Sequence, residues 1–196
     1  MVASWQRSVA PDFEPISLEE AKAQMRVTHS DEDGVILGFI AAARETGEEY
    51  LGRAIPESTW VLALSDWADE VPLPMAAPVQ SITSVEYYNE SGTLTTLSST
   101  YYALDSIRRP AYLMKAPNQV WPALQSDRRT WRVKVTYVAG WASAAVVPER
   151  IRQGIRLYLA HLDLNRDGSE ASAALARKAA EACWSDRVFF PPVECW

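Results

Sequence analysis

The stretch DLNRDG at residues 163–168 places oxygen-bearing side chains at the spacing of a calcium-binding loop. It matches the first half of an EF-hand, whose twelfth position supplies a bidentate glutamate and whose eighth position is aliphatic. These two positions are Ala174 and Glu170 here, so the second half of the loop fails. We interpret the stretch as a polar turn between two helices, and we predict no metal site and no cofactor.

Residues suited to acid–base or nucleophilic catalysis are scarce. The histidines are His29 and His161, and His161 lies beside the apolar stripe of a predicted helix, where a packed or half-exposed ring is expected. Cys183 and Cys195 lack the spacing of zinc ligands, and one such pair favours a reducing compartment over a disulfide framework. The sequence also lacks a nucleophile elbow, a phosphate-binding loop and a dinucleotide fingerprint. We therefore predict no catalytic residue and no enzymatic activity.

Eight tryptophans are many for 196 residues. Several fall in or beside predicted strands, where packing in a core is the simplest role for so large a ring. Stacking on a sugar is the functional alternative, which keeps a tryptophan-rich carbohydrate-binding module as a rival prediction.

The C-terminal tail, residues 185–196, is apolar and interrupted by two prolines. Its bulky side chains are Val188, Phe189, Phe190, Val193 and Trp196. Burying one such side chain contributes about 1.5–3 kcal/mol, so the tail either folds back on its own domain or docks on another protein. These five residues are our candidates for docking on a partner.

The net charge of −6 is concentrated near the N-terminus, where residues 17–57 hold nine acidic and four basic residues. A protein that grips nucleic acid by its phosphates needs a basic face, which this balance disfavours. An acidic surface suits a duct through which DNA slides without sticking. Glu45, Glu48 and Glu49 are our candidates for that surface. No apolar run approaches the ~20 residues of a membrane span, so no membrane is expected.

Helices are predicted at both ends of the chain. Residues 17–26 open on the capping box SLEE, and residues 31–52 repeat apolar side chains at helical spacing before a glycine. Pro148 opens a third helix, in which Gly154 costs ~1 kcal/mol of helix propensity. An alanine-rich fourth helix covers residues 169–184.

Between these helices the period of the apolar residues changes to two. The strand candidates are residues 59–64, 85–87, 93–97, 101–104, 111–115 and 131–138. In the last of them, Trp131, Val133, Val135 and Tyr137 alternate with polar side chains, and one wet face indicates an antiparallel sheet.

The predicted fold class is α+β, with an antiparallel β region inserted into a helical body made of the N-terminal helix pair and the C-terminal helices. The predicted divisions are an N-terminal arm and helix pair at 1–57, the β region at 58–147, the C-terminal helices at 148–184 and the tail at 185–196.

Two stretches of the chain resemble the head–tail connector family of tailed bacteriophages, also called adaptor or head-completion proteins. The first runs from PISLEEAKAQMRV through an acidic DED to AAARETGEEYLGRAI, and the second is VKVTYVAGWASAAVVPERIRQGIRLYLAHLDLNR. In order they cover residues 15–166, with a β block between them that is only loosely similar. Related adaptors occur in the gene transfer agents of some bacteria, so both kinds of particle stay open.

This resemblance implies a structural protein that forms a ring, commonly of twelve copies, beneath the portal of a DNA-filled capsid. The ring extends the channel, lets double-stranded DNA pass without specific binding, and carries the next ring or the tail. The implied partners are the portal protein, a stopper or terminator protein and further copies of the chain. The implied location is the head–tail junction of a virion or phage-like particle, after assembly in the bacterial cytoplasm. A tail-terminator or stopper ring is the alternative in the same class.

Overall fold

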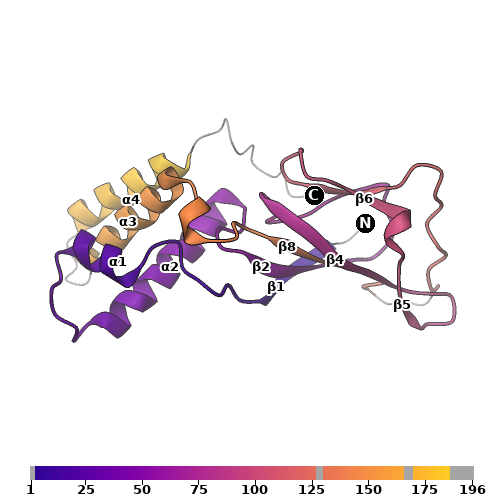
Figure 1. Ribbon diagram of the computed structural model, residues 1–196, viewed down its shortest axis with the longest axis horizontal. Helices are drawn as coiled ribbons and strands as arrows, with labels where there is room; N and C mark the ends of the chain where they lie inside the picture. Colours follow the sequence, from indigo (N-terminus) through magenta and orange to yellow (C-terminus); the bar gives the residue numbers. More distant parts are fainter. Residues whose placement is uncertain (1–2, 127–129, 166–169, 186–196) are drawn as a thin grey trace. The chain divides into compact units, whose positions relative to one another are not determined.

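The segments with alternating apolar residues in the middle of the sequence form strands of two antiparallel sheets (Figure 1). The computed structural model describes residues 3–126, 130–165 and 170–185. The chain forms two units, which we call the β unit (residues 1–11 and 57–140) and the helical unit (residues 12–56 and 141–196). The α+β fold class with an inserted antiparallel β region is therefore confirmed.

The larger sheet of the β unit has the strand order β1-β2-β8-β4-β5. Its strands are β1 (Ala3–Val9), β2 (Ser58–Leu64), β4 (Val79–Tyr88), β5 (Leu94–Thr96) and β8 (Val133–Ala139). Trp60 of β2 lies opposite Tyr137 of β8, and Leu62 lies opposite Val135. All four side chains are buried, whereas Lys134 on the other face of β8 is exposed, as the alternation predicts.

The smaller sheet has the order β3-β7-β6. Its strands are β3 (Glu70–Pro72), β6 (Tyr102–Asp105) and β7 (Tyr112–Lys115), and a short 3-10 helix, η1 (Ser99–Tyr101), precedes β6. Val71 and Leu113 of this sheet are buried. The hydroxyl of Tyr137 donates a hydrogen bond to the carbonyl of Pro74, just beyond β3, and burial raises the pKa of Tyr137 so that this donor keeps its proton. This bond ties the two sheets together.

The helical unit contains α1 (Leu18–Met25), α2 (Asp33–Leu51), α3 (Glu149–Leu164) and α4 (Glu170–Trp184), with a 3-10 turn, η2 (Ala144–Val146), before α3. Ser17 and Glu20 form the predicted capping box in both directions, and Gly52 ends α2 in the left-handed conformation at φ 62°. Both helix-end predictions are confirmed. None of the described helices is both long enough and apolar enough to cross a lipid bilayer.

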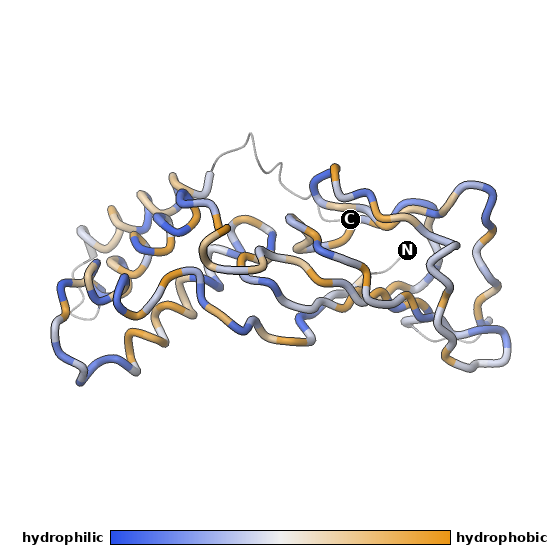
Figure 2. Tube along the Cα trace, viewed as in Figure 1, coloured by the Kyte–Doolittle hydropathy of each residue, from blue (hydrophilic) through white to orange (hydrophobic). Residues whose placement is uncertain are grey.

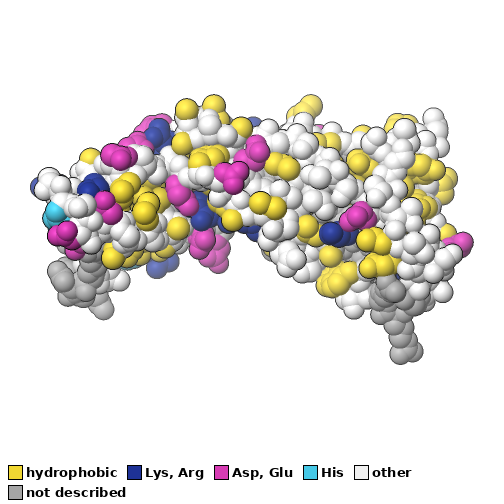
Figure 3. Space-filling view, turned by 60° about the horizontal axis from the view of Figure 1, so that its bottom comes forward, with side chains coloured by type: hydrophobic (Ala, Val, Ile, Leu, Met, Phe, Trp, Pro, Cys, Tyr) yellow, Lys and Arg dark blue, Asp and Glu magenta, His cyan; other side chains and the backbone are white. Residues whose placement is uncertain are grey.

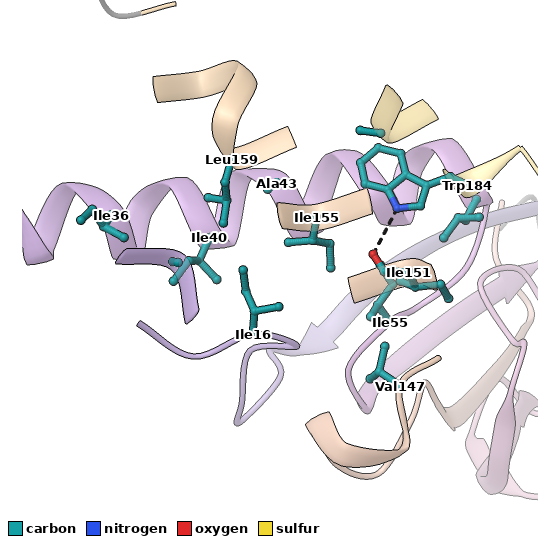
Figure 4. Close-up of a cluster of buried hydrophobic side chains, with 13 residues drawn as sticks. Ile16, Ile36, Ile40, Ala43, Ile55, Val147, Ile151, Ile155, Leu159 and Trp184 are labelled. Atoms are coloured by element: carbon teal, nitrogen blue, oxygen red, sulfur yellow. Dashed lines mark hydrogen bonds between the residues drawn. The ribbon is translucent and has the colours of Figure 1, made fainter. Parts of the chain in front are cut away.

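The core of the helical unit lies between α2, α3 and the end of α4 (Figure 4). Its buried members include Ile16, Ile36, Ile40, Ala43, Ile55, Ile151, Ile155, Leu159 and Trp184. Apolar residues recur along α2 (orange in Figure 2), and the helix buries Ile36, Ile40 and Ala43 on one side. Most of the apolar stripe predicted for residues 31–52 is therefore core.

Gly154 has a packing role in this core. A Cβ atom at Gly154 would lie 2.1 Å from Nε1 of Trp184, so only glycine lets the indole rest on the backbone of α3. The indole N–H points to the carbonyl of Ile151 at 3.4 Å, and Trp184 is 2% exposed. Burial of the ring offsets the helix propensity of about 1 kcal/mol that glycine loses.

The structure differs from the predicted strands in four places. β1 and β3 were not predicted, and β8 begins at Val133, so Trp131 lies before the strand and is 37% exposed. β1 gave no signal because most of its side chains are exposed on both faces, which removes any alternation. β4 is longer than predicted, since two register shifts against β8 interrupt its period of two.

Candidate functional site

Arg44 of α2 is the centre of a buried ion cluster in the helical unit. Its Nε lies 2.9 Å from an oxygen of Glu14, and its Nη1 lies 2.9 Å from Oε2 of Glu48. Oε1 of Glu48 accepts a hydrogen bond from the backbone N–H of Ile55 at 2.9 Å. The side chains of Arg44 and Glu48 are only 5% and 4% exposed. This cluster fixes α2 to the segment before α1 and to the chain that follows α2.

A second cluster joins α1 to α3. One oxygen of Glu20 accepts hydrogen bonds from Nη2 of Arg152 at 2.6 Å and from Nη2 of Arg156 at 2.8 Å. Its other oxygen accepts from the backbone N–H of Ser17 at 2.9 Å. Arg152 and Arg156 also pair with Glu149 at the start of α3. Glu20 therefore both caps α1 and holds α3 against it.

The two clusters shift carboxyl pKa values in opposite directions. Burial raises the pKa of Glu14 above its ordinary value, and the guanidinium of Arg44 offsets only part of this effect. Burial acts in the same direction on Glu20, but hydrogen bonds from Ser17 and Arg156 outweigh it, so the pKa of Glu20 is lowered. Glu20 therefore stays ionised under more acidic conditions than Glu14.

The three carboxylates predicted to face a DNA channel lie in two different environments. Glu48 is 3% exposed, and its two oxygens are engaged by Arg44 and by the backbone of Ile55. Glu45 and Glu49 lie on the exposed side of α2. Only these two of the three candidates present a carboxylate to solvent, and their facing a channel stays a prediction.

The proposed docking residues of the tail, Val188 to Trp196, lie outside the described residues. Residues 166–168 of the half-matched calcium loop also lie outside them. Within the described ranges, His, Cys, Asp and Glu side chains form no group of three that could hold a metal ion.

His161 and the pair of Trp67 and Trp121 have packing roles. Nδ1 of His161 lies 2.8 Å from the carbonyl oxygen of Ala173, and the ring contacts Tyr158 at 5.1 Å between centroids. This confirms the half-exposed, packed histidine predicted for the third helix. Trp67 and Trp121 stack on each other at 4.6 Å with ring planes 7° apart, so one face of each ring is covered.

One surface that the sequence analysis missed is the outer side of α2. Val35 and Leu37 are 50% and 51% exposed there, although an average apolar helix residue would be expected in the core. The glycines at positions 34 and 38 were the available signal, because both lie on the same exposed side with open space above them. We call the exposed residues Gly34, Val35, Leu37, Gly38, Ala42, Glu45 and Glu49 the α2 outer face.

Comparison with known families supports the resemblance seen in the sequence. The model of the phage gp6-like head-tail connector protein family matches residues 15–108. This stretch contains α1, α2 and the central residue of each ion cluster, Arg44 and Glu20. The resemblance to phage head–tail connectors is thus confirmed. A search of curated proteins found no match.

Solved structures with a similar fold come from gene transfer agent particles. A chain in the neck of an empty gene transfer agent particle, computed with C6 symmetry, has 22% sequence identity and a TM-score of 0.74 over 92% of this chain and 94% of that chain. A chain in the virion of the native particle has 22% identity and a TM-score of 0.73 over the same shares. A third, in the neck of the native particle computed with C12 symmetry, has 22% identity and a TM-score of 0.64 over 90% of this chain and 93% of that chain. Because these matches cover at least 90% of this chain, both the β unit and the helical unit have counterparts in the similar structures.

Proposed function

We propose that this chain, which resembles the phage head–tail connectors, is a structural subunit of the neck of a phage or gene transfer agent particle. It forms a ring beneath the portal, joins the head to the tail and extends the channel for DNA. Its role is assembly, and it turns over no substrate. Its place in the cell is the cytoplasm during assembly and the head–tail junction afterwards.

The observation that carries this proposal is the extent of the structural likeness. The match to a neck chain of a gene transfer agent particle spans 92% of this chain and 94% of that one. Fold alone does not assign function, but the family model over residues 15–108 points to the same class of protein independently.

The proposed partners are the portal protein, a stopper or terminator protein and further copies of the chain, with twelve copies in the ring. Sixfold and twelvefold symmetry were applied to the similar neck structures, which is compatible with a ring of that size. Double-stranded DNA passes through the ring without specific binding, since the net charge of −6 disfavours a grip on phosphates.

The tail residues Val188, Phe189, Phe190, Val193 and Trp196 are proposed to dock on the portal. One modest contact from each copy would add up by avidity once the copies are held in a ring.

Sedimentation with the portal tests this function directly. The purified chain is mixed with the portal protein encoded in the same genome, and the complex is analysed by analytical ultracentrifugation. One chain per portal subunit is expected. A chain that stays monomeric beside an intact portal, or that assembles only with a tail protein, would favour the rival tail-terminator or stopper.

The carbohydrate-binding alternative has a separate test. Tryptophan fluorescence is followed while a panel of sugars is added, and no quenching is expected because the stacked pair of Trp67 and Trp121 is already engaged. Saturable quenching by one sugar would support the rival instead.

A further inference from the structure

We propose that neighbouring copies of the chain contact each other in the ring through the α2 outer face of one copy and α4 of the next. This inference rests on the proposed function, because it names the partner of an exposed surface of the same molecule. A ring needs two different faces on each copy that fit each other and a rotation that closes.

The α2 outer face has the composition of a contact surface. Val35 and Leu37 flank Gly34 and Gly38, and a Cβ atom at either glycine would meet nothing within 4 Å. Figure 3 turns the α2 side of the helical unit forward and shows apolar side chains (yellow) among acidic ones (magenta). Small residues between apolar ones allow a second helix to approach closely, at the 8–10 Å typical of packed helices.

The same face continues into negative charge. Glu45 and Glu49 follow Ala42 by three and seven residues, which keeps all three on one side of α2. Glu45 is 64% exposed and touches Arg44. Among the described residues Glu49 has neither an ion pair nor a side-chain hydrogen bond.

The exposed side of α4 carries an apolar side chain and the opposite charge. Leu175 is 69% exposed, and Lys178 and Ala182 follow it by three and seven residues, also exposed. Within the described part of the chain, the ammonium of Lys178 has no partner. Leu175 and Lys178 thus repeat the spacing of Ala42 and Glu45 with an apolar knob and the opposite charge.

The directions of the helices suit this pairing. α2 and α4 each pack on α3 and run the same way along the helical unit (Figure 1). A twelvefold ring rotates each copy by only about 30°, so α4 of one copy stays close to parallel with α2 of the next. In a parallel pairing Leu175 lies over Gly38 and Ala42, and Lys178 comes level with Glu45.

Contact with a second copy fits this face better than contact with DNA. A duct that repels DNA needs a wet, acidic wall, whereas Val35 and Leu37 would leave apolar surface in water. Glu45 also comes level with the opposite charge of Lys178 on α4. We therefore assign Glu45 and Glu49 to the contact between copies. The alternative that the experiment must exclude is that these carboxylates line the DNA channel.

Cysteine cross-linking in purified particles tests the contact. The chain carries A42C and L175C in a background of C183S and C195S, and the particles are mildly oxidised. We expect a ladder of disulfide-linked multimers, because each copy is joined to the next through different faces. Either cysteine alone should give no ladder. A chain present in the neck but still monomeric after oxidation would overturn the inference, and A42C alone forming dimers would overturn it too. A chain missing from the particles would contradict the proposed function itself.

Charge exchange provides the second test. Glu45→Lys and Lys178→Glu should each lower the amount of chain per particle by about tenfold, and the double variant should restore it, because every contact then pairs the exchanged charges. Unchanged melting temperatures of the isolated variants would show that these exposed positions do not affect folding. Glu45→Lys particles with a full complement of chain but less DNA would instead place this face in the channel and overturn the inference.

Discussion

Arg44 neutralises some of the carboxylates around α2 inside the helical unit and leaves others exposed. Its buried guanidinium is shared by Glu14 and Glu48, so these carboxylates are neutralised inside the helical unit. Glu45 contacts the same guanidinium but remains 64% exposed. Only some of the acidic residues in 17–57 therefore contribute negative charge to the surface. Burial, unlike the count of charges, could not be read from spacing alone.

Arg44→Met tests the buried cluster. It removes the partner of Glu48 and leaves a carboxylate that is 4% exposed without its guanidinium, so we expect a loss of about 3 kcal/mol in the free energy of unfolding. Urea denaturation measures this loss. Glu45→Gln is the matched control, since it alters an exposed partner of the same guanidinium and should cost under about 1 kcal/mol. Equal losses for both variants would contradict the buried cluster.

The lowered pKa of Glu20 predicts how the stability of the helical unit depends on pH. Its pKa is lowered in the folded state, so its contribution is present above the ordinary carboxyl pKa of 4.5 and is lost as pH falls through the lowered value. Glu20→Gln should therefore be less stable than the wild type at pH 7 and similar to it near pH 3. Denaturation at both values checks this, with Glu49→Gln as the control, because Glu49 is exposed and makes no ion pair with the described residues. A difference that persists in acid would show that the charge of Glu20 is not responsible.

At the scale of the elements, the sequence predicted features that depend on neighbouring residues, and it did not predict features that depend on contacts between residues far apart in the chain. The capping box at Ser17, the glycine after α2 and the alternation of β8 each depend on neighbouring residues, and each was predicted correctly. By contrast, β1 pairs with residues 50 to 61 positions away, from Val9 with Thr59 to Ala3 with Leu64. The role of Gly154 depends on Trp184, 30 positions away. No local pattern encodes them.

Gly154→Ala tests the packing of α4 on α3. The added methyl group would overlap the indole of Trp184, so we expect a loss of about 2 kcal/mol despite the better helix propensity of alanine. Gly38→Ala is the matched control, because open space surrounds that position and the change should stabilise the isolated chain by up to about 1 kcal/mol. Thermal melting compares the two. A stabilising Gly154→Ala would mean that Trp184 does not lie on α3.

At the scale of the whole molecule, the described residues place their charge and apolar surface where contact with other proteins can use them. The cores of the two units are closed by their own side chains, whereas Val35, Leu37 and Leu175 remain exposed on helices. The resemblance to connectors could be predicted from two ordered sequence stretches. The contact faces could not, because they depend on which side of each helix the core occupies.

Deleting Ser185 to Trp196 tests the tail. α4 ends at Trp184, so the truncated chain should keep its helical core and its circular dichroism spectrum. It should no longer sediment with the portal, since the proposed apolar anchors are gone. Truncated chain that binds the portal as well as the full chain does would exclude the tail as the docking segment.

The most direct measurement is electron cryo-microscopy of particles from the native producer. The account predicts that the fold of this chain fits, in a ring of twelve copies, the density between the portal and the tail at the single tailed vertex. Density at that place explained by another protein, with this chain located in the capsid shell, at the tail tip or nowhere in the particle, would contradict it.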